Sequence, residues 1–182
     1  HAYCLDLLTE TAFADGCDWV ATFDLDSWPV LHGWDRALTA LLTPEHPVVA
    51  MVRAEIGDNF PLGAFTLIER SFWRTGESSF SVSLRNVTPQ EILQQISRPV
   101  ETGAGILAQL LGDGIAFYEL RKTNRWNPHP MMGALYGDLI FHLGAGSRRS
   151  KFKTDAEQFQ LDGNTLKNRL RYEVNKAVRG FL

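Results

Sequence analysis

The segment that most constrains this chain is an apolar run ending in two carboxylates. Residues 18–29 read Asp-Trp-Val-Ala-Thr-Phe-Asp-Leu-Asp-Ser-Trp-Pro. The nearly continuous apolar run over 19–25 predicts a strand covered on both faces, which Pro29 brings to an end. Alternate side chains of a strand share a face, so we expect Asp24 and Asp26 to point the same way at its carboxyl end.

Two carboxylates this close repel each other unless a cation lies between them or one of them takes a proton. Oxygen ligands suit a hard divalent ion such as Mg²⁺ or Mn²⁺, which can also hold a phosphate. The spacing of Asp24 and Asp26 therefore indicates a candidate metal site. The plain alternative is an aspartate-rich turn at a strand end.

Length and composition narrow the class of protein. The chain has 182 residues, with 45% hydrophobic and 21% charged residues, as expected of one ordinary globular domain. A net charge of −3 argues against nucleic acid or an acidic membrane as the partner. The two cysteines, Cys4 and Cys17, form neither a disulfide framework nor a C-x-x-C pair, which favours a reducing compartment and a cytoplasmic location.

Neither a membrane-spanning run nor a signal peptide is visible in the sequence. The chain starts at His1 and enters a helical pattern at once, so we expect that its natural beginning is missing.

The hydrophobic pattern predicts alternating helices and strands, the rhythm of an α/β domain. The expected helices cover 5–13, 34–42, 102–111 and 165–178, with a further helix start at Thr88; the expected strands cover 19–25, 48–53, 65–69, 80–84, 115–120 and 139–143.

A second constellation follows the last of these strands. Residues 136–153 read Tyr-Gly-Asp-Leu-Ile-Phe-His-Leu-Gly-Ala-Gly-Ser-Arg-Arg-Ser-Lys-Phe-Lys. Imidazole is a competent third ligand for Mn²⁺, glycines let backbone N–H groups approach an anion, and cations neutralise phosphate. The plain alternative is a core histidine followed by a solvated basic loop. The residues concerned are His142, Gly144, Gly146, Ser147, Arg148, Arg149, Lys151 and Lys153.

Taken together, the two segments supply what a metal-bound diphosphate needs. Ligands of open α/β sheets collect beyond the carboxyl ends of strands, where both segments are expected.

The stretch Phe-Asp-Leu-Asp-Ser-Trp-Pro, followed by Gly33, Trp34 and an amphipathic helix, resembles the central region of nucleotide-sugar glycosyltransferases of the GT-A fold (family 2-like). The resemblance covers about residues 1–150. It implies an α/β, Rossmann-like mixed sheet flanked by helices that lacks the first nucleotide-binding strands. The chain would then be a single partial domain over 1–182, with a core over 1–150 and a helical C-terminal segment over 151–182.

The resemblance also implies roles. Asp24 and Asp26 would hold Mn²⁺ or Mg²⁺ on the diphosphate of a UDP- or GDP-sugar, and His142 would complete the coordination. Arg148 and Arg149 would stabilise the leaving diphosphate, beside the Gly144–Gly146–Ser147 turn. The sugar acceptor is not identified.

Two further residues carry open alternatives. Glu101, just before an expected helix, is the candidate base of an inverting enzyme or a helix cap. Trp28, beside the paired aspartates, is the candidate sugar-stacking residue or a packing residue.

Two other functions compete with glycosyl transfer. A phosphatase of the haloacid-dehalogenase type also uses a D-x-D motif after a strand, but that motif requires Thr or Val at the position where this chain has Trp28. A noncatalytic module of the same fold would keep metal and nucleotide affinity without turnover.

Overall fold

A computed structural model describes residues 2–81, 102–125, 127 and 132–144. The chain divides into two compact units: His1–Asp24 with Asp35–Leu120, and Leu25–Trp34 with Arg121–Leu182. We describe the first as unit 1 and the second as unit 2.

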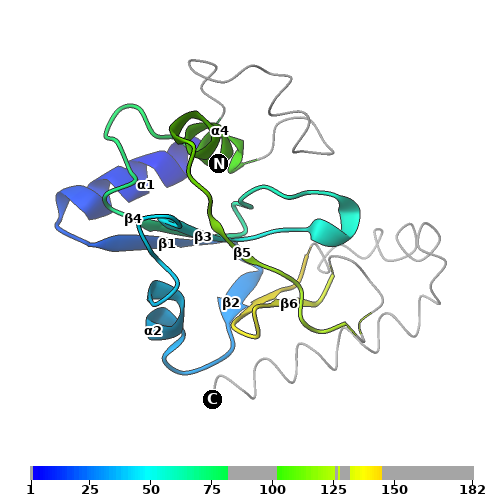
Figure 1. The fold of residues 1–182 in the computed structure, drawn as a ribbon. Helices are drawn as coiled ribbons and strands as arrows, with labels where there is room; N and C mark the ends of the chain where they lie inside the picture. Colours follow the sequence, from blue (N-terminus) through cyan, green and yellow to red (C-terminus); the bar gives the residue numbers. More distant parts are fainter. Residues whose placement is uncertain (1, 82–101, 126, 128–131, 145–182) are drawn as a thin grey trace. The chain divides into compact units, whose positions relative to one another are not determined.

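Unit 1 is built on a four-stranded mixed sheet (Figure 1). Its order is β1 (Trp19–Phe23), β4 (Phe65–Glu69), β3 (Val48–Met51) and β5 (Tyr118–Leu120). The β1–β4 and β3–β4 pairs are antiparallel, whereas β3 and β5 run parallel. The expectation of an α/β domain with a mixed sheet is therefore confirmed.

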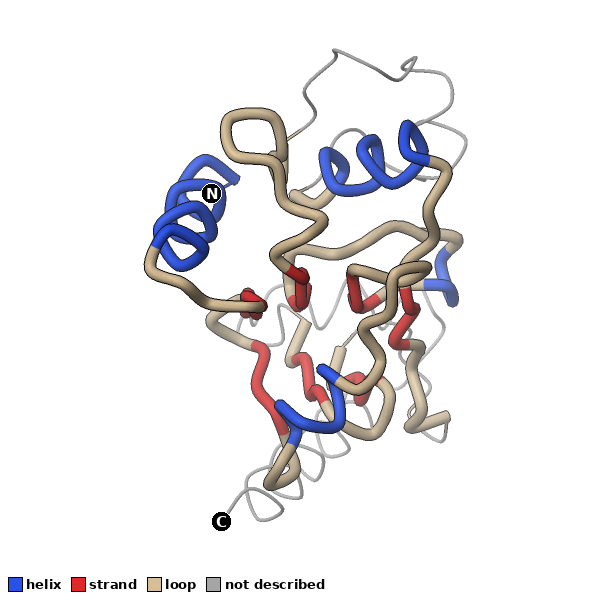
Figure 2. The backbone as a smooth tube through the Cα atoms, turned by 60° about the vertical axis from the view of Figure 1, so that its left-hand side comes forward, coloured by secondary structure: helices blue, strands red, loops and turns tan. Residues whose placement is uncertain are grey.

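The core of unit 1 lies between this sheet and two helices. The helices α1 (Ala2–Ala14) and α4 (Ala104–Asp113) lie over one face of the sheet, as Figures 1 and 2 both show. Ile68 pairs with both Val20 and Val48, so these three side chains share the face that the helices cover. The shorter helix α2 (Trp34–Thr39) lies on the other side of the sheet. The fully buried members of the cluster under α1 and α4 are Val48, Ala50, Ile68, Phe80 and Ile106.

Strand β1 differs from its prediction. It ends at Phe23, before both aspartates, and Thr22 is its only buried residue. The reason is its place in the sheet: β1 is the terminal strand in the observed order and bonds to β4. An end strand is less covered than a central one, whereas β3, in the middle, is buried throughout.

Unit 2 contains a three-stranded antiparallel sheet in the order β2 (Ser27–Pro29), β7 (Ile140–His142) and β6 (Ala134–Tyr136). The turn between β6 and β7 has Gly137 at φ 57° and Asp138 at φ 58°. Pro29 does not end the strand expected over 19–25, because β1 already stops at Phe23. It is instead the last residue of β2, a terminal strand, where a missing N–H is tolerated.

Most expected elements have counterparts. The helices over 5–13, 34–42 and 102–111 correspond to α1, a shorter α2 and α4, and the strands over 48–53, 65–69, 115–120 and 139–143 to β3, β4, β5 and β7. The short strands β2 and β6 and the 3₁₀ turn η1 (Ala54–Ile56) were not predicted. The helices at Thr88 and over 165–178 lie outside the described residues, as do positions 82–84 of the strand expected over 80–84, whose Phe80 and Ser81 are not in a strand. In the described part of the chain, no helix is long and apolar enough to cross a membrane.

The start of α4 fits tightly against a neighbouring loop. A Cβ at Gly105 would lie 2.0 Å from the carbonyl oxygen of Ser81 and 2.2 Å from that of Ser79. These are backbone atoms, so the loop must shift to admit any side chain. Gly112, in the same helix, has no atom within 4 Å of its virtual Cβ.

We therefore predict opposite effects from one substitution at two positions of α4. Gly105→Ala should lower the free energy of unfolding by about 1–3 kcal/mol through overpacking. Gly112→Ala should raise it by about 0.5–1 kcal/mol, because alanine favours the helix. Urea denaturation of both variants measures the difference. Equal effects at the two positions would contradict this packing.

A buried ion pair closes the loop after β3. The Arg53 guanidinium lies 2.7 Å from the carboxylate of Asp58, whose side chain is fully buried. The backbone N–H of each residue also donates to the carbonyl of the other, at 3.0 and 3.2 Å. Loss of one partner from a buried pair leaves the other charge uncompensated.

Asp58→Ala should therefore cost about 3–5 kcal/mol of stability. Asp113→Ala is the matched control, because Asp113 pairs at 2.8 Å with Arg74, which is half-exposed. That substitution should cost less than about 1 kcal/mol. Chemical denaturation compares the two variants, and similar losses would show that burial of the Arg53–Asp58 pair does not matter.

Candidate metal centre

The two aspartates lie where the chain leaves one sheet and enters another. The N–H of Asp24 donates to the carbonyl of Ala64 at 3.0 Å, which extends the β1–β4 pairing. The carbonyl of Asp26 accepts the N–H of Leu143 at 2.8 Å, which extends the β2–β7 pairing. The intervening Leu25 is fully exposed. The aspartates thus stand in a short connection, not on one strand as predicted.

The histidine stands on β7, in register with this connection. His142 pairs with Ser27 of β2 on one side and with Ala134 of β6 on the other. Its Nε2 lies 3.5 Å from Oδ1 of Asp26. The His142 side chain is only 13% exposed and that of Asp26 29%, so the pair is shielded but reachable.

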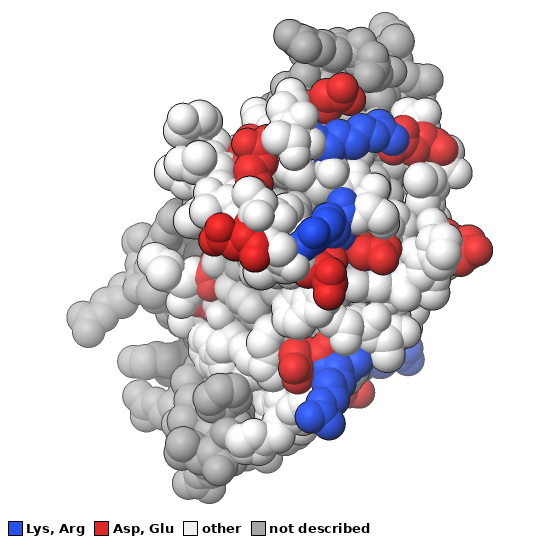
Figure 3. Space-filling view, turned by 90° about the vertical axis from the view of Figure 1, so that its left-hand side faces the viewer, with Lys and Arg blue, Asp and Glu red and all other residues white. Residues whose placement is uncertain are grey.

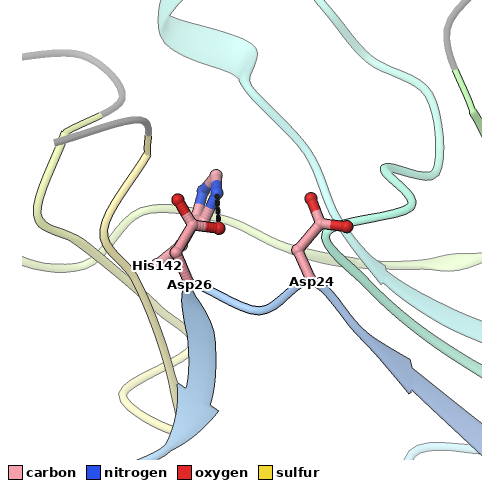
Figure 4. A group of neighbouring side chains, drawn as sticks. All are labelled: Asp24, Asp26 and His142. Atoms are coloured by element: carbon pink, nitrogen blue, oxygen red, sulfur yellow. Dashed lines mark ion pairs between the residues drawn. The ribbon is translucent and has the colours of Figure 1, made fainter. Parts of the chain in front are cut away.

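Figure 4 shows the imidazole of His142 beside the carboxylate of Asp26, with the carboxylate of Asp24 projecting on the same side of the chain. One ligand atom from each residue can be chosen so that all three lie within 4.8 Å of one another. The chain itself ties Asp24 to Asp26, since a single residue separates them. His142 is distant in the sequence, yet its side chain lies beside that of Asp26.

The spacing fits one small divalent ion. With bonds of 2.0–2.1 Å in an octahedral shell, ligand atoms lie about 3.0 Å apart at right angles and about 4.2 Å apart across the ion. The 3.5 Å between Asp26 and His142 falls in this range, and the upper limit of 4.8 Å requires only a small contraction. Two carboxylates and an imidazole form a donor set suited to Mn²⁺ or Mg²⁺.

Trp28 lies away from this imidazole. It pairs with Phe141 across the β2–β7 ladder, with their ring centroids 4.8 Å apart. Because side chains alternate along a strand, Trp28 and Phe141 occupy the face of the sheet opposite to Ser27 and His142. Trp28, Phe141 and Val30 pack in one apolar cluster. Of the two readings of Trp28, this arrangement favours packing.

The remaining candidate residues are described only in part. Gly144 is buried and has φ 66°, a left-handed backbone conformation that glycine adopts readily. Gly146, Ser147, Arg148 and Arg149 lie outside the described residues, and so does the candidate base Glu101.

A cavity of about 850 Å³ lies in unit 1, between α1, the loop over 74–81 and α4. None of the three candidate ligands lines it. Asp6 and Glu10 on its wall accept backbone N–H bonds from Phe80 at 2.7 Å and Gly76 at 2.9 Å, so they have structural roles. The face drawn in Figure 3 shows basic side chains interspersed among acidic ones, without an extended basic patch.

Sequence reasoning missed one polar residue of the centre, Ser27. Its Oγ is buried and has no hydrogen-bond partner among the described residues. The position of Ser27 directly after Asp26 was a signal in the sequence. Its pairing with His142, however, depends on strand β2, which was not predicted.

No protein-family model matches this chain, and no curated protein or solved structure is significantly similar to it.

The geometry predicts that Asp26→Asn weakens Mn²⁺ binding by more than about 100-fold, because even outer partners of a metal site are worth 10–100-fold. Titration calorimetry measures the affinity. Asp138→Asn is the matched control: it removes an exposed carboxylate of unit 2, and asparagine also tolerates positive φ. An equal loss in both variants would mean that general charge, not the Asp26 ligand, drives binding.

Proposed function

We propose that this chain is a metal-dependent glycosyltransferase that moves a sugar from a nucleotide-diphosphate sugar to an acceptor. The observation that supports the proposal is the cluster of Asp24, Asp26 and His142, whose ligand atoms lie within 4.8 Å of one another. The substrate class comes from the resemblance to GT-A enzymes carried by the aspartate motif and its flanks.

The two carboxylates and the imidazole would hold Mn²⁺ or Mg²⁺. Such an ion neutralises the negative charge that develops on a departing diphosphate. The shielding of Asp26 and His142 strengthens this effect, because charges interact more strongly away from bulk water.

Other residues of the chain would complete the reaction. Gly144 has φ 66°, and a glycine leaves room for the backbone N–H groups next to it to approach a bound anion. In the proposal, the following Gly146, Ser147, Arg148 and Arg149 hold the diphosphate, the arginines in a forked arrangement. Glu101 would take the proton from the acceptor hydroxyl if the enzyme inverts configuration.

A noncatalytic binding module of the same fold is the second candidate. The cluster of Asp24, Asp26 and His142 supports metal and diphosphate binding equally in both cases. What separates the two functions is turnover.

The test is calorimetric titration of the chain with UDP and GDP, each with and without Mn²⁺, followed by assays for hydrolysis of the matching nucleotide sugar. We expect nucleotide binding only when Mn²⁺ is present, together with slow hydrolysis. Asp26→Ala should abolish the Mn²⁺-dependent part, while circular dichroism shows an intact fold.

Binding without any hydrolysis would favour the binding module over the transferase. Nucleotide affinity that does not depend on Mn²⁺, or that persists in Asp26→Ala, would overturn both candidate functions.

A further inference from the structure

Two polar side-chain atoms of unit 2 are buried, and neither has a hydrogen-bond partner among the described residues. These atoms are the Oγ of Ser27 and the Nδ1 of His142. A buried polar group left unpaired costs about 1–3 kcal/mol, so such groups call for an explanation.

The sheet register makes these two atoms neighbours. Ser27 and His142 are directly opposite each other on the antiparallel pair β2–β7. Opposite residues point to the same face, with Cβ atoms roughly 4.5–5.5 Å apart. The next pair, Trp28 and Phe141, points to the other face and packs there with Val30. The hydroxyl and the imidazole thus share one face, away from this cluster.

The two ring nitrogens of His142 have different surroundings. Nε2 faces the Asp26 carboxylate at 3.5 Å, whereas Nδ1 is enclosed in the protein. A neutral imidazole that binds a metal through Nε2 carries its proton on Nδ1, and that N–H needs an acceptor. The hydroxyl of serine has lone pairs to accept it.

We propose that Ser27 is the positioning residue of this centre: its Oγ accepts the Nδ1–H of His142 and so keeps Nε2 free for the ion. Rotation about χ1 of Ser27 can turn Oγ toward the imidazole, because the Cβ atoms of opposite residues are only roughly 4.5–5.5 Å apart. The inference rests on the proposed metal site, but it concerns a hydrogen bond that the protein can form without the ion.

The decisive variant is Ser27→Ala, which removes the hydroxyl and nothing else. We expect Mn²⁺ affinity to fall about 10–100-fold, the range for loss of a partner that orients a metal ligand. Stability should stay level or rise, because alanine leaves no unpaired buried hydroxyl. Ser27→Thr keeps a hydroxyl and should restore most of the affinity.

A second readout follows the histidine directly. Nitrogen-15 NMR of the metal-free protein, assigned by comparison with His142→Gln, reports which ring nitrogen carries the proton. We expect a single Nδ1–H form in the native chain and a mixture of forms in Ser27→Ala. A merely structural serine would not change this ratio.

Thr9→Val is the matched control. Thr9 lies in α1 of unit 1, and its Oγ1 is also buried without a partner among the described residues. Its removal should change neither Mn²⁺ affinity nor the form of His142. Unchanged affinity and an unchanged NMR ratio in Ser27→Ala would overturn the inference while leaving the metal site standing. Absence of Mn²⁺ binding in the native chain would instead defeat the proposed function, and the NMR ratio would still decide the role of Ser27.

Discussion

The candidate site depends on a pair of backbone hydrogen bonds on either side of one exposed leucine. Asp24 is tied by its N–H to Ala64, and Asp26 is tied by its carbonyl to Leu143. Each bond is worth only about 0.5–1.5 kcal/mol, but it fixes the direction in which the adjoining carboxylate leaves the backbone. A metal site profits from ligands that are held before the ion arrives, and here that restraint comes from main-chain pairing.

The sequence was informative wherever a local pattern was strong. The apolar run before Asp24 predicted β1, the apolar residues around Ile106 predicted α4, and the run before His142 predicted β7. Carboxylates two residues apart and a histidine at a strand end led to the hypothesis of a shared metal site, and the side chains of Asp26 and His142 do lie together. The three elements could be predicted because hydrophobic periodicity can be read within a few neighbouring residues.

The failures share a different physical cause. Strand β2 has only three residues and contains a proline, so its existence depends on pairing with the distant β7. The face occupied by Trp28 follows from that pairing, which no local pattern contains. The carboxylate of Asp58 is fully buried against Arg53, and nothing in the local pattern around Asp58 indicates that pairing. Partners chosen by tertiary structure override local propensity in each case.

The tight connection between β6 and β7 determines which environment the imidazole occupies. Because side chains alternate, loss or gain of one residue near Gly137 and Asp138 would exchange His142 with Phe141. The aromatic ring would then lie on the polar face of the sheet beside Ser27, and the imidazole would lie on the apolar face beside Trp28. The number of residues in the β6–β7 turn is therefore more strictly constrained than their identity. Conservative substitutions in the turn are compatible with the site, whereas an insertion or deletion of an odd number of residues is not.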